Sequence, residues 1–216
     1  MPLFFRNLLA GLALLCLAAP LHAQDDKDAA RKEMHGSGKM IQEQKTLKPF
    51  DALEIKEFNA DVIVEVGGTA STADIRIDDN LRPYLRIEEE EDGRLKLSFR
   101  GPDDHPFRMN KSSVTVTLRT PTLRRLAHGS NSDVTVNGLR GDNFSLANAG
   151  NGNVTLRGQV TTLEIASAAN GSIRAEALAA DQANVVTQAN ASVRVNAKSM
   201  NLVKAGNGSV TNVGEK

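Results

Sequence analysis

Carboxylates and imidazoles are the side chains of this sequence that could do chemistry. His105 stands in the stretch GPDDHPF beside Asp103 and Asp104, a grouping that could bind a metal ion or transfer a proton. Pro102 and Pro106 flank it, and proline at both sides is typical of an exposed loop. We therefore interpret this stretch as a loop and not as a site.

Two aspartates recur at one position of a repeat in the second half of the chain. Asp142 and Asp181 each lie nine residues before a repeated asparagine, but Thr161 fills the same position in the unit between them. If the units stack as strands, the two backbones lie about 10 Å apart, too far to share one calcium ion with ligand distances of about 2.3–2.6 Å. Asp133 falls at a different position, so we interpret all three as solvated turn carboxylates.

The sequence also lacks the serine motif and the mature-chain cysteine that nucleophilic catalysis would use. No serine stands in Gly-x-Ser-x-Gly, and the one cysteine, Cys16, lies in the first 23 residues. His128 occupies a repeated polar position, shared with Asn148, Ser167, Thr187 and Lys204. The sequence therefore predicts no catalytic residue, no cofactor and no metal site, and a protein that is not an enzyme.

Residues 1–23 have the pattern of a cleaved signal peptide. Arg6 precedes an apolar run from Leu8 to Ala19, and Leu21-His22-Ala23 offers a small residue at the cleavage point. The alternatives are an uncleaved anchor, for which about 12 apolar residues fall short of the roughly 20 needed, and lipidation of Cys16, which the preceding Leu15 does not suit. We expect export to the periplasm, the cell surface or the medium, with no membrane span after cleavage.

Charge and cysteine content restrict the mature chain further. Its 193 residues (216 minus 23) hold no cysteine, so burial and backbone pairing must stabilise it in place of disulfides. Removal of Arg6 leaves 25 basic against 26 acidic residues, a balance that predicts neither nucleic acid nor an anionic membrane as partner.

The first half of the mature chain reads as a polar lead-in followed by strands. Residues 24–46 lack apolar periodicity and predict a flexible linker. From Phe50 the period becomes two, at 61–66, 74–77, 85–87, 95–99 and 114–118, and Asp92-Gly93 predicts a hairpin. Four glutamates at 88–91 are typical of a solvated strand end.

A short unit repeats through the second half, at 122–213. Aliphatic residues stand three residues after and five residues before each repeated asparagine, and the asparagines are 20, 19, 20 and 17 residues apart. The asparagines are Asn131, Asn151, Asn170, Asn190 and Asn207; the aliphatics after them are Val134, Val154, Ile173, Val193 and Val210, and those before are Leu126, Leu146, Ile165, Val185 and Leu202. A unit this small cannot bury its own apolar face, which predicts stacking of about five rungs.

Two arrangements fit the repeat, a solenoid of stacked rungs and an antiparallel meander. The near-constant period favours the solenoid. In it, asparagine and glycine would take left-handed backbone conformations at the corners, and stacked asparagines would bond to one another. Asn212 breaks the inward apolar pattern in the last unit, which is typical of a terminal cap.

The sequence resembles the autotransporter-adhesin head GIN domain family, a bacterial domain of unknown function. The resemblance rests on LKPFDALEIKEFNADVIVEVGG and on the turns GSNSDVTV, AGNGNVTL, AANGSIRA, QANASVRV and AGNGSVTN, within about 47–213. It implies an all-β, right-handed parallel β-helix-like solenoid, similar in shape to pectin lyases but without their catalytic residues, with adhesion as the suggested role. Where this chain has asparagine-rich turns, family members usually carry Gly-Ser-Gly.

The most promising contact surface is a ladder of outward positions, one residue after each inward aliphatic: Thr135, Thr155, Arg174, Arg194 and Thr211. Such a flat ladder could contact an extended protein or glycan, although Phe144 is the only aromatic residue of the repeats. We expect an exported, non-enzymatic module for adhesion or cell-envelope contact. The alternative is a protein that binds or cleaves polysaccharide, and the open ends of a solenoid would allow self-association.

Overall fold

The chain folds as an all-β protein. The computed structural model describes residues 33–101, 108–109, 114–188 and 190–214, and within them the only helix is the short 3-10 turn η1 (Arg82–Tyr84). The all-β prediction is confirmed. The strands are β1 (Glu33–Met34), β2 (Met40–Leu47), β3 (Ala52–Lys56), β4 (Asp61–Val66), β5 (Ser71–Asp78), β6 (Leu85–Glu89), β7 (Arg94–Phe99), β8 (Arg108–Met109), β9 (Val114–Thr120), β10 (Arg125–Gly129), β11 (Val134–Asn148), β12 (Val154–Ser167), β13 (Ile173–Thr187), β14 (Ser192–Lys204) and β15 (Ser209–Asn212).

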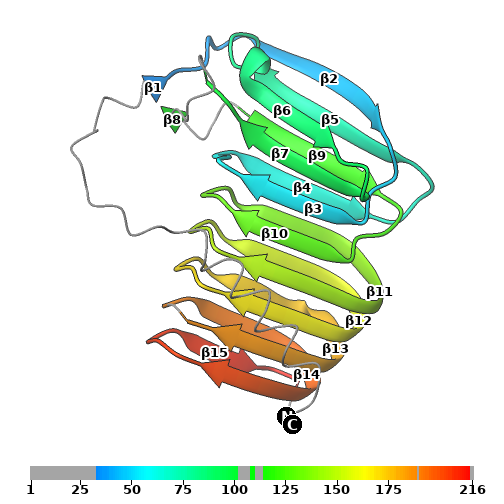
Figure 1. The fold of residues 1–216 in the computed structure, drawn as a ribbon, viewed down its shortest axis with the longest axis vertical. Helices are drawn as coiled ribbons and strands as arrows, with labels where there is room; N and C mark the ends of the chain where they lie inside the picture. The colour runs from blue at the N-terminus through cyan, green and yellow to red at the C-terminus, as the bar shows by residue number, and fades with distance from the viewer. Residues whose placement is uncertain (1–32, 102–107, 110–113, 189, 215–216) are drawn as a thin grey trace.

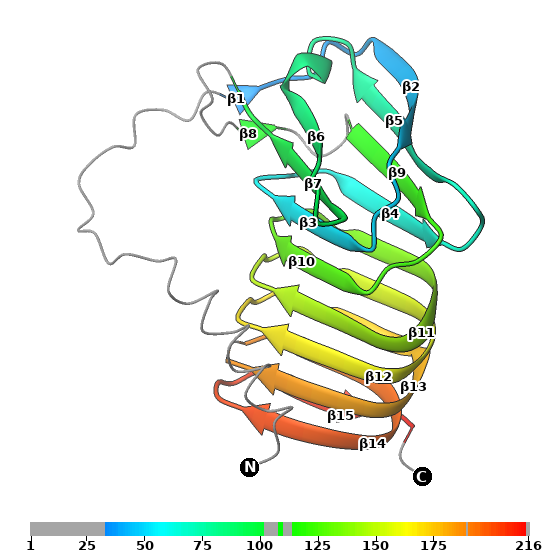
Figure 2. The same cartoon turned by 45° about the vertical axis from the view of Figure 1, so that its right-hand side comes forward.

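The repeated units stack on one another in parallel. Each strand from β10 to β14 pairs with the next one along the chain, always parallel, which gives the column of rungs in Figures 1 and 2. Each of the long strands β11 to β13 has a register shift in its middle, where the chain passes from one broad side of the column to the other. Parallel pairing rules out the antiparallel meander.

The positions equated from the sequence lie above one another. Val134, Val154, Ile173, Val193 and Val210 are consecutive ladder partners, and so are Leu126, Leu146, Ile165, Val185 and Leu202. In the second set the exposed fraction of the side chains is 0–1% in the first four rungs. Burial of each such side chain contributes about 1.5–3 kcal/mol, so the aliphatic columns stabilise the stack.

The N-terminal half supplies further rungs out of chain order. β3 pairs with β10 and β4 pairs with β11, while on their other sides β3 pairs with β7 and β4 with β9, all parallel. The rung of β3 and β4 thus lies between two rungs that follow it in sequence. Its turn carries Asn59, three residues before Val62, the ladder partner of Val134.

Antiparallel strands close the N-terminal end of the column. β5 pairs with β9 and β2 pairs with β5, and the expected hairpin through Asp92-Gly93 joins β6 to β7. β1 and residues 40–46 of β2 lie inside the 24–46 segment that we expected to be a flexible linker, so that expectation is wrong for residues 33–34 and 40–46. The sequence of β2, MIQEQKTL, does not show the apolar alternation of a strand, because it is mostly polar on both faces. Such a composition suits an exposed edge strand.

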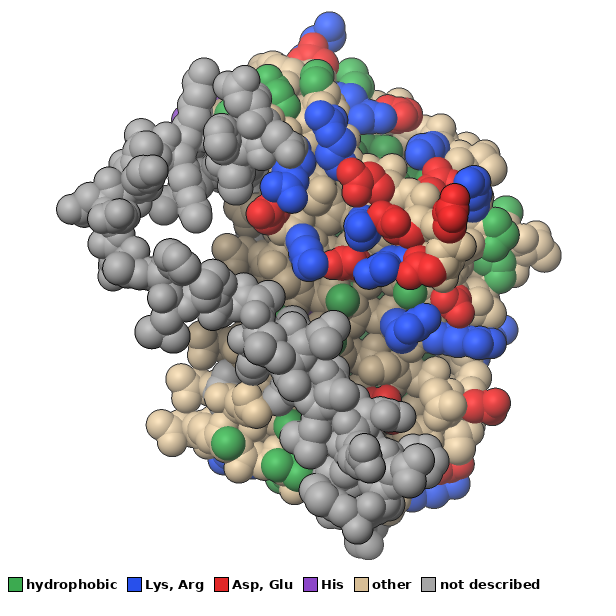
Figure 3. Space-filling model, viewed as in Figure 1, with side chains coloured by type: hydrophobic (Ala, Val, Ile, Leu, Met, Phe, Trp, Pro, Cys, Tyr) green, Lys and Arg blue, Asp and Glu red, His purple; other side chains and the backbone are tan. Residues whose placement is uncertain are grey.

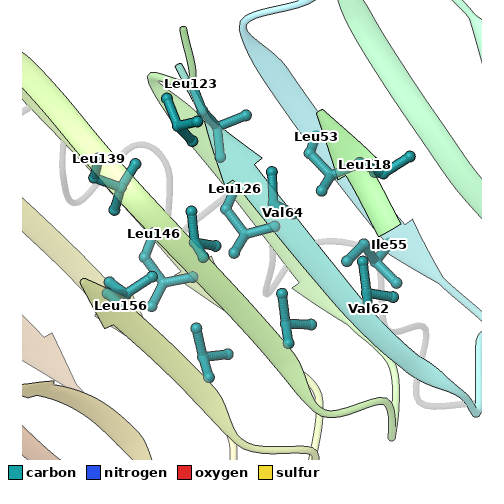
Figure 4. Close-up of a cluster of buried hydrophobic side chains, with 14 of the residues drawn as sticks. Leu53, Ile55, Val62, Val64, Leu118, Leu123, Leu126, Leu139, Leu146 and Leu156 are labelled. Atoms are coloured by element: carbon teal, nitrogen blue, oxygen red, sulfur yellow. The ribbon is translucent and has the colours of Figure 1, made fainter. Parts of the chain in front are cut away.

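One continuous apolar core runs through the regular and irregular rungs. Figure 4 shows Leu53 and Ile55 of β3, Val62 and Val64 of β4, and leucines of the repeats packed between the two broad sides. The predicted strands of the first half are all present, and their inward residues belong to this same cluster. The described N-terminal half is therefore built onto the repeats and has no separate core.

The corners depend on close backbone approach and not on left-handed asparagines. Glu57 is the only non-glycine residue with positive φ among the described residues, so the expected left-handed asparagines are absent from the described turns. A Cβ on Gly152 would lie 1.8 Å from the carbonyl oxygen of Ser132, and one on Gly171 would lie 2.2 Å from that of Gly152. Successive corners nest so closely that only the smallest residues fit.

Gly152→Ala is therefore expected to destabilise the fold by about 1–3 kcal/mol or more, because the new methyl group must push two rungs apart. Gly129→Ala is the matched control, since its Cβ would meet no atom closer than 3.7 Å. Chemical denaturation of both variants measures the difference, and equal unfolding free energies would contradict this account of the corners.

Candidate contact surface

The two broad sides of the column present different outer surfaces. We call A face the outward side chains of β4, β15 and residues 134–137, 154–157, 173–176 and 192–195. We call B face those of β3, β7, β10 and residues 143–148, 162–167, 182–187 and 199–204. Strand alternation places each outward residue between two core residues, so both faces are rows of side chains at rung spacing.

The A face brings the predicted contact residues together. Thr135, Thr155, Arg174, Arg194 and Thr211 are ladder partners in consecutive rungs. Both arginines are exposed, and the flanking threonines range from half-buried to exposed. The Nε of Arg194 lies 4.0 Å from Oε1 of Glu176, at the limit of an ion pair. Like charges directly opposite each other on a sheet are destabilising, so this pair of arginines has a cost in the isolated domain.

Polar side chains continue the A face on both sides of the ladder. Arg157 donates to Oδ1 of Asn137 at 3.0 Å, and Asn137 in turn donates to Glu65 at 2.8 Å. Asp133, one of the three aspartates considered above, accepts from the backbone and side-chain nitrogens of Asn153 at 2.9 and 3.1 Å. Its carboxylate thus ties two rungs together.

The B face is charged where it covers the irregular rungs. Figure 3 shows Lys and Arg side chains interleaved with Asp and Glu on the half of this face near the N-terminal cap. Two shallow hollows, of about 200 and 290 Å³, lie there on either side of Glu54. Charged side chains line both hollows, although nothing in the sequence patterns pointed to them.

Glu54 is the centre of the charged cluster on the B face. Its carboxylate pairs with Lys56 and, at 3.2 Å, with Nη1 of Arg94, whose other nitrogen binds Asp92 at 2.9 Å. Burial raises the pKa of Glu54, but the hydrogen bond from Lys56 and the nearby Arg94 and Lys96 together hold that pKa below its ordinary value. These charges largely neutralise one another, which suits a structural network better than a ligand site.

A third set of polar residues lies inside the column. His128, Asn148, Ser167 and Thr187 follow one another in consecutive rungs, as the sequence predicted, but all four are buried, at 0–1% exposure. Nδ1 of His128 lies 2.8 Å from Oδ1 of Asn148, and Nε2 lies 3.2 Å from Oγ of Ser132. The sequence contained a signal for this burial, because each of the four residues lies two residues after an inward aliphatic, and residues two apart on a strand point to the same side.

The residues considered for chemistry remain apart. Asp142 and Asp181 are in one register with Thr161 between them, and Asp181 binds Lys198 at 2.7 Å. Within the part of the chain that the structure describes, no three His, Cys, Asp or Glu residues are placed to hold a metal ion. His105 and Cys16 lie outside the described residues. Nor is any helix of the described part long and apolar enough to cross a membrane.

The repeated asparagines lie at the outer corners of the rungs and are exposed. One hydrogen bond joins neighbours of this column in the described structure, from Nδ2 of Asn170 to Oδ1 of Asn151 at 3.4 Å. The expected continuous asparagine ladder is therefore weak. Inside the turns, the residue after each asparagine is buried, and it is always Ser, Gly or Ala.

Comparison with protein families matches residues 49–215 to the family described as "Putative auto-transporter adhesin, head GIN domain". The chain belongs to this family. No curated protein matches the sequence.

Solved structures from Bacteroides and Parabacteroides species share the fold of this GIN domain. A "putative adhesin" of Bacteroides fragilis is 18% identical, with TM-score 0.58, 83% of this chain covered and 100% of the other. A "putative lipid binding protein" of Parabacteroides distasonis is 15% identical, with TM-score 0.51 and coverages of 84% and 100%. A "putative adhesin" of Parabacteroides merdae is 17% identical, with TM-score 0.50 and coverages of 84% and 99%. At these identities the likeness shows the fold alone.

The buried imidazole makes the stability of the GIN domain depend on pH. Burial lowers the pKa of His128, outweighing the bond to Asn148 and the charge of Asp133, so the unfolded chain, with an ordinary value near 6.5, takes up the proton first as pH falls. The contribution of His128 to the free energy of unfolding is complete above about pH 6.5 and decreases below it, toward the folded-state pKa, by at most about 1.4 kcal/mol per pH unit.

His128→Gln should flatten this dependence of the unfolding free energy on pH in denaturation curves between pH 5 and 8. His35→Gln, at an exposed histidine, should leave it unchanged; equal slopes in both variants would contradict the prediction.

Proposed function

We propose that this GIN domain is an exported, non-enzymatic, right-handed parallel β-helix-like solenoid that acts by surface contact, in adhesion or at the cell envelope. Membership of the adhesin-head family supports the role. The domain would comprise residues 47–213 with its repeats at 122–213, after a signal peptide at 1–23. The A face is the contact surface, and its centre is the ladder of Thr135, Thr155, Arg174, Arg194 and Thr211.

The stacked pair of Arg174 and Arg194 is the observation that carries this assignment. The two residues are direct ladder partners and both are exposed. Among the described residues, Glu176 is the one acid that comes near them, at the limit of an ion pair with Arg194. A fold that needs only a strand-forming residue at these positions can use threonine, as the other three rungs do. An anionic partner would convert the repulsion between the two guanidinium groups into paired, charge-assisted hydrogen bonds.

Carboxylate-bearing protein or glycan surfaces are the partners that fit this face. Guanidinium groups bind carboxylates in a bidentate manner, and the neighbouring threonine hydroxyls can donate or accept further hydrogen bonds. An extended chain laid along the column would meet a new rung about every 4.8 Å. Contacts of this kind need no deep pocket, because each rung adds a small contribution along a flat surface.

Arg174→Glu combined with Arg194→Glu should weaken binding of the mature chain to carboxymethyl-dextran at least about tenfold, since two favourable charge pairs become repulsive. Surface plasmon resonance on carboxymethyl-dextran and on neutral dextran measures the change. Arg125→Glu is the matched control, an exposed arginine on the B face with no close ion pair in the described structure. Equal binding of the double variant and the control, or equal binding to both dextrans, would overturn the assignment to the A face.

Polysaccharide cleavage is distinguishable from contact alone. Release of unsaturated sugar from acidic polysaccharide by the purified mature chain, with or without calcium, would replace the contact function by an enzymatic one. Unchanged polysaccharide under both conditions is the expected result.

The location of the protein can be tested on intact cells. If it acts in adhesion, protease added to intact cells should digest the mature chain, as detected with an antibody, to the same extent as in lysed cells. Protection until lysis would confine its contacts to the interior of the envelope and would contradict adhesion to other cells.

A further inference from the structure

The C-terminal rung leaves apolar side chains uncovered, and one of them is at a core position. Leu202 occupies the inward column whose other members are 0–1% exposed, yet its own exposed fraction is 42%. Val203 and Val213, in the same rung, are 44% and 42% exposed. Three of the four large apolar residues that are exposed in the described structure therefore gather at this one end, and the fourth, Met40, lies at the other.

The backbone at this end is also open. Residues 199–204 pair with β13 on one side, and β15 pairs with the first part of β14; within the described residues neither has a strand on its other side. Exposed edges are usually protected by charge, proline or a bulge. Here residues 199–203 read SMNLV and β15 reads SVTN, with no charge and no proline; the charged residues Lys198 and Lys204 lie only at the two ends of the 199–203 segment.

The opposite end of the column shows what a protected end looks like. There β2, β5 and β6 close the core, and charged pairs such as Arg82 with Glu43 at 2.5 Å and Lys45 with Glu89 at 2.9 Å lie on the outer edges. The core residues beneath, including Leu81, Ile75 and Ile77, are fully buried. The two ends are thus chemically unlike, and a head-to-tail contact would pair an apolar end with a charged one.

Asn212 caps only one corner of the last rung. Its Oδ1 accepts from the backbone nitrogens of Ala197 at 2.9 Å and Gly214 at 3.1 Å, and its Nδ2 donates to the carbonyl oxygen of Ala197 at 2.9 Å. These bonds satisfy backbone groups of the corner, as the sequence led us to expect of a cap. They do not reach the column of Leu202 or the edge of residues 199–204.

We propose that the C-terminal end of the column is a homodimer interface, in which two copies meet end to end about a twofold axis. Residues 199–204 of one copy pair antiparallel with 199–204 of the other, and β15 with β15. Like edges pair because their lengths match, whereas pairing β15 with 199–204 would leave backbone groups unpaired. The contact closes on itself, since each copy has one such end, and it produces a dimer and not a filament.

The size of the end predicts a weak dimer. A cross-section of about six residues at 3.3 Å each, across two sheets roughly 10 Å apart with their own thickness, is on the order of 400 Å² per copy. About 800 Å² in total is below the 1,200–2,000 Å² of stable complexes. Dimer formation should therefore depend on concentration, in the micromolar to millimolar range.

Analytical ultracentrifugation of the mature chain between about 1 µM and 1 mM tests the proposal first. We expect the average mass to rise toward that of a dimer and no further. Leu202→Lys should shift dissociation to at least about tenfold higher concentration, because it places a charge in the interface, whereas Thr155→Lys, in the middle of the A face, should not. A wild-type chain that stays monomeric at 1 mM, or masses beyond a dimer, would overturn the proposal.

Cross-linking tests which ends meet. The mature chain has no cysteine of its own, so a single introduced cysteine reports one position. Asn201→Cys lies in the middle of the proposed edge, and Ser145→Cys lies in the same outward column three rungs away. A short bis-maleimide should link Asn201→Cys into dimers and leave Ser145→Cys monomeric. Equal linking of both, or linking of Asn201→Cys only to a Gln44→Cys chain at the opposite end, would contradict the twofold arrangement.

Discussion

In-register parallel pairing between rungs is the constraint on which the rest of the structure depends. Outside the register shifts in the middle of the long strands, each residue of one rung lies directly above its equivalent in the next, from β4 and β11 to β15. Equivalent positions of successive rungs therefore carry the same kind of side chain: aliphatic inside the column, small at the corners and polar outside. At the corners the choice of residue is narrow. A Cβ on Gly152 would clash with the backbone of the neighbouring rung, because the two backbones lie too close together to leave room for a side chain. A rung that shifted by one residue would exchange its inner and outer faces along its whole length.

The same constraint explains the buried polar column. His128 points inward beside the turn, where its ring bonds to Asn148 in the next rung and to Ser132 in its own turn. A buried polar group that loses its partner costs about 1–3 kcal/mol, so neighbours in such a column depend on one another. In the next two rungs the column continues with the smaller side chains of Ser167 and Thr187. Their hydroxyl oxygens have no hydrogen-bond partner among the described residues. The column is therefore best satisfied at its histidine end, which lies where the regular repeats join the irregular rungs.

The repeats were predictable from sequence because one rung equals one period, and the column partners of the five units follow from counting alone. The N-terminal rungs were not predictable, since the cap strands separate β3 and β4 in sequence from their neighbours β10 and β11, and no fixed period spans that insertion. Asn59 carries only half of the repeat signature, because Val62 stands three residues after it but Glu54, and not an aliphatic residue, stands five residues before it. The charged network around Glu54 assembles β3, β6 and β7 through long-range pairing, and this pairing is a property of topology that local pattern does not contain. The row of outward residues in the contact ladder was predictable from sequence. The repulsion between Arg174 and Arg194 followed only from the structure, which pairs the two residues directly.

A stack of this kind separates the demands of folding from those of recognition. The inner columns and the corners fix the backbone, so an outward residue of the A face can change with little effect on stability as long as it tolerates a strand. An outward residue that departs from the best strand former therefore needs a reason outside the fold. Arg174 opposite Arg194 is such a departure. At the end of the column, the exposure of the inward residue Leu202 is a second feature that the isolated fold does not explain. If like edges pair across the proposed interface, the A faces of two copies lie on one side of a continuous column. An extended partner bound along one ladder would then be held near the second, and the effective concentration of the second ladder would strengthen contacts that are individually weak.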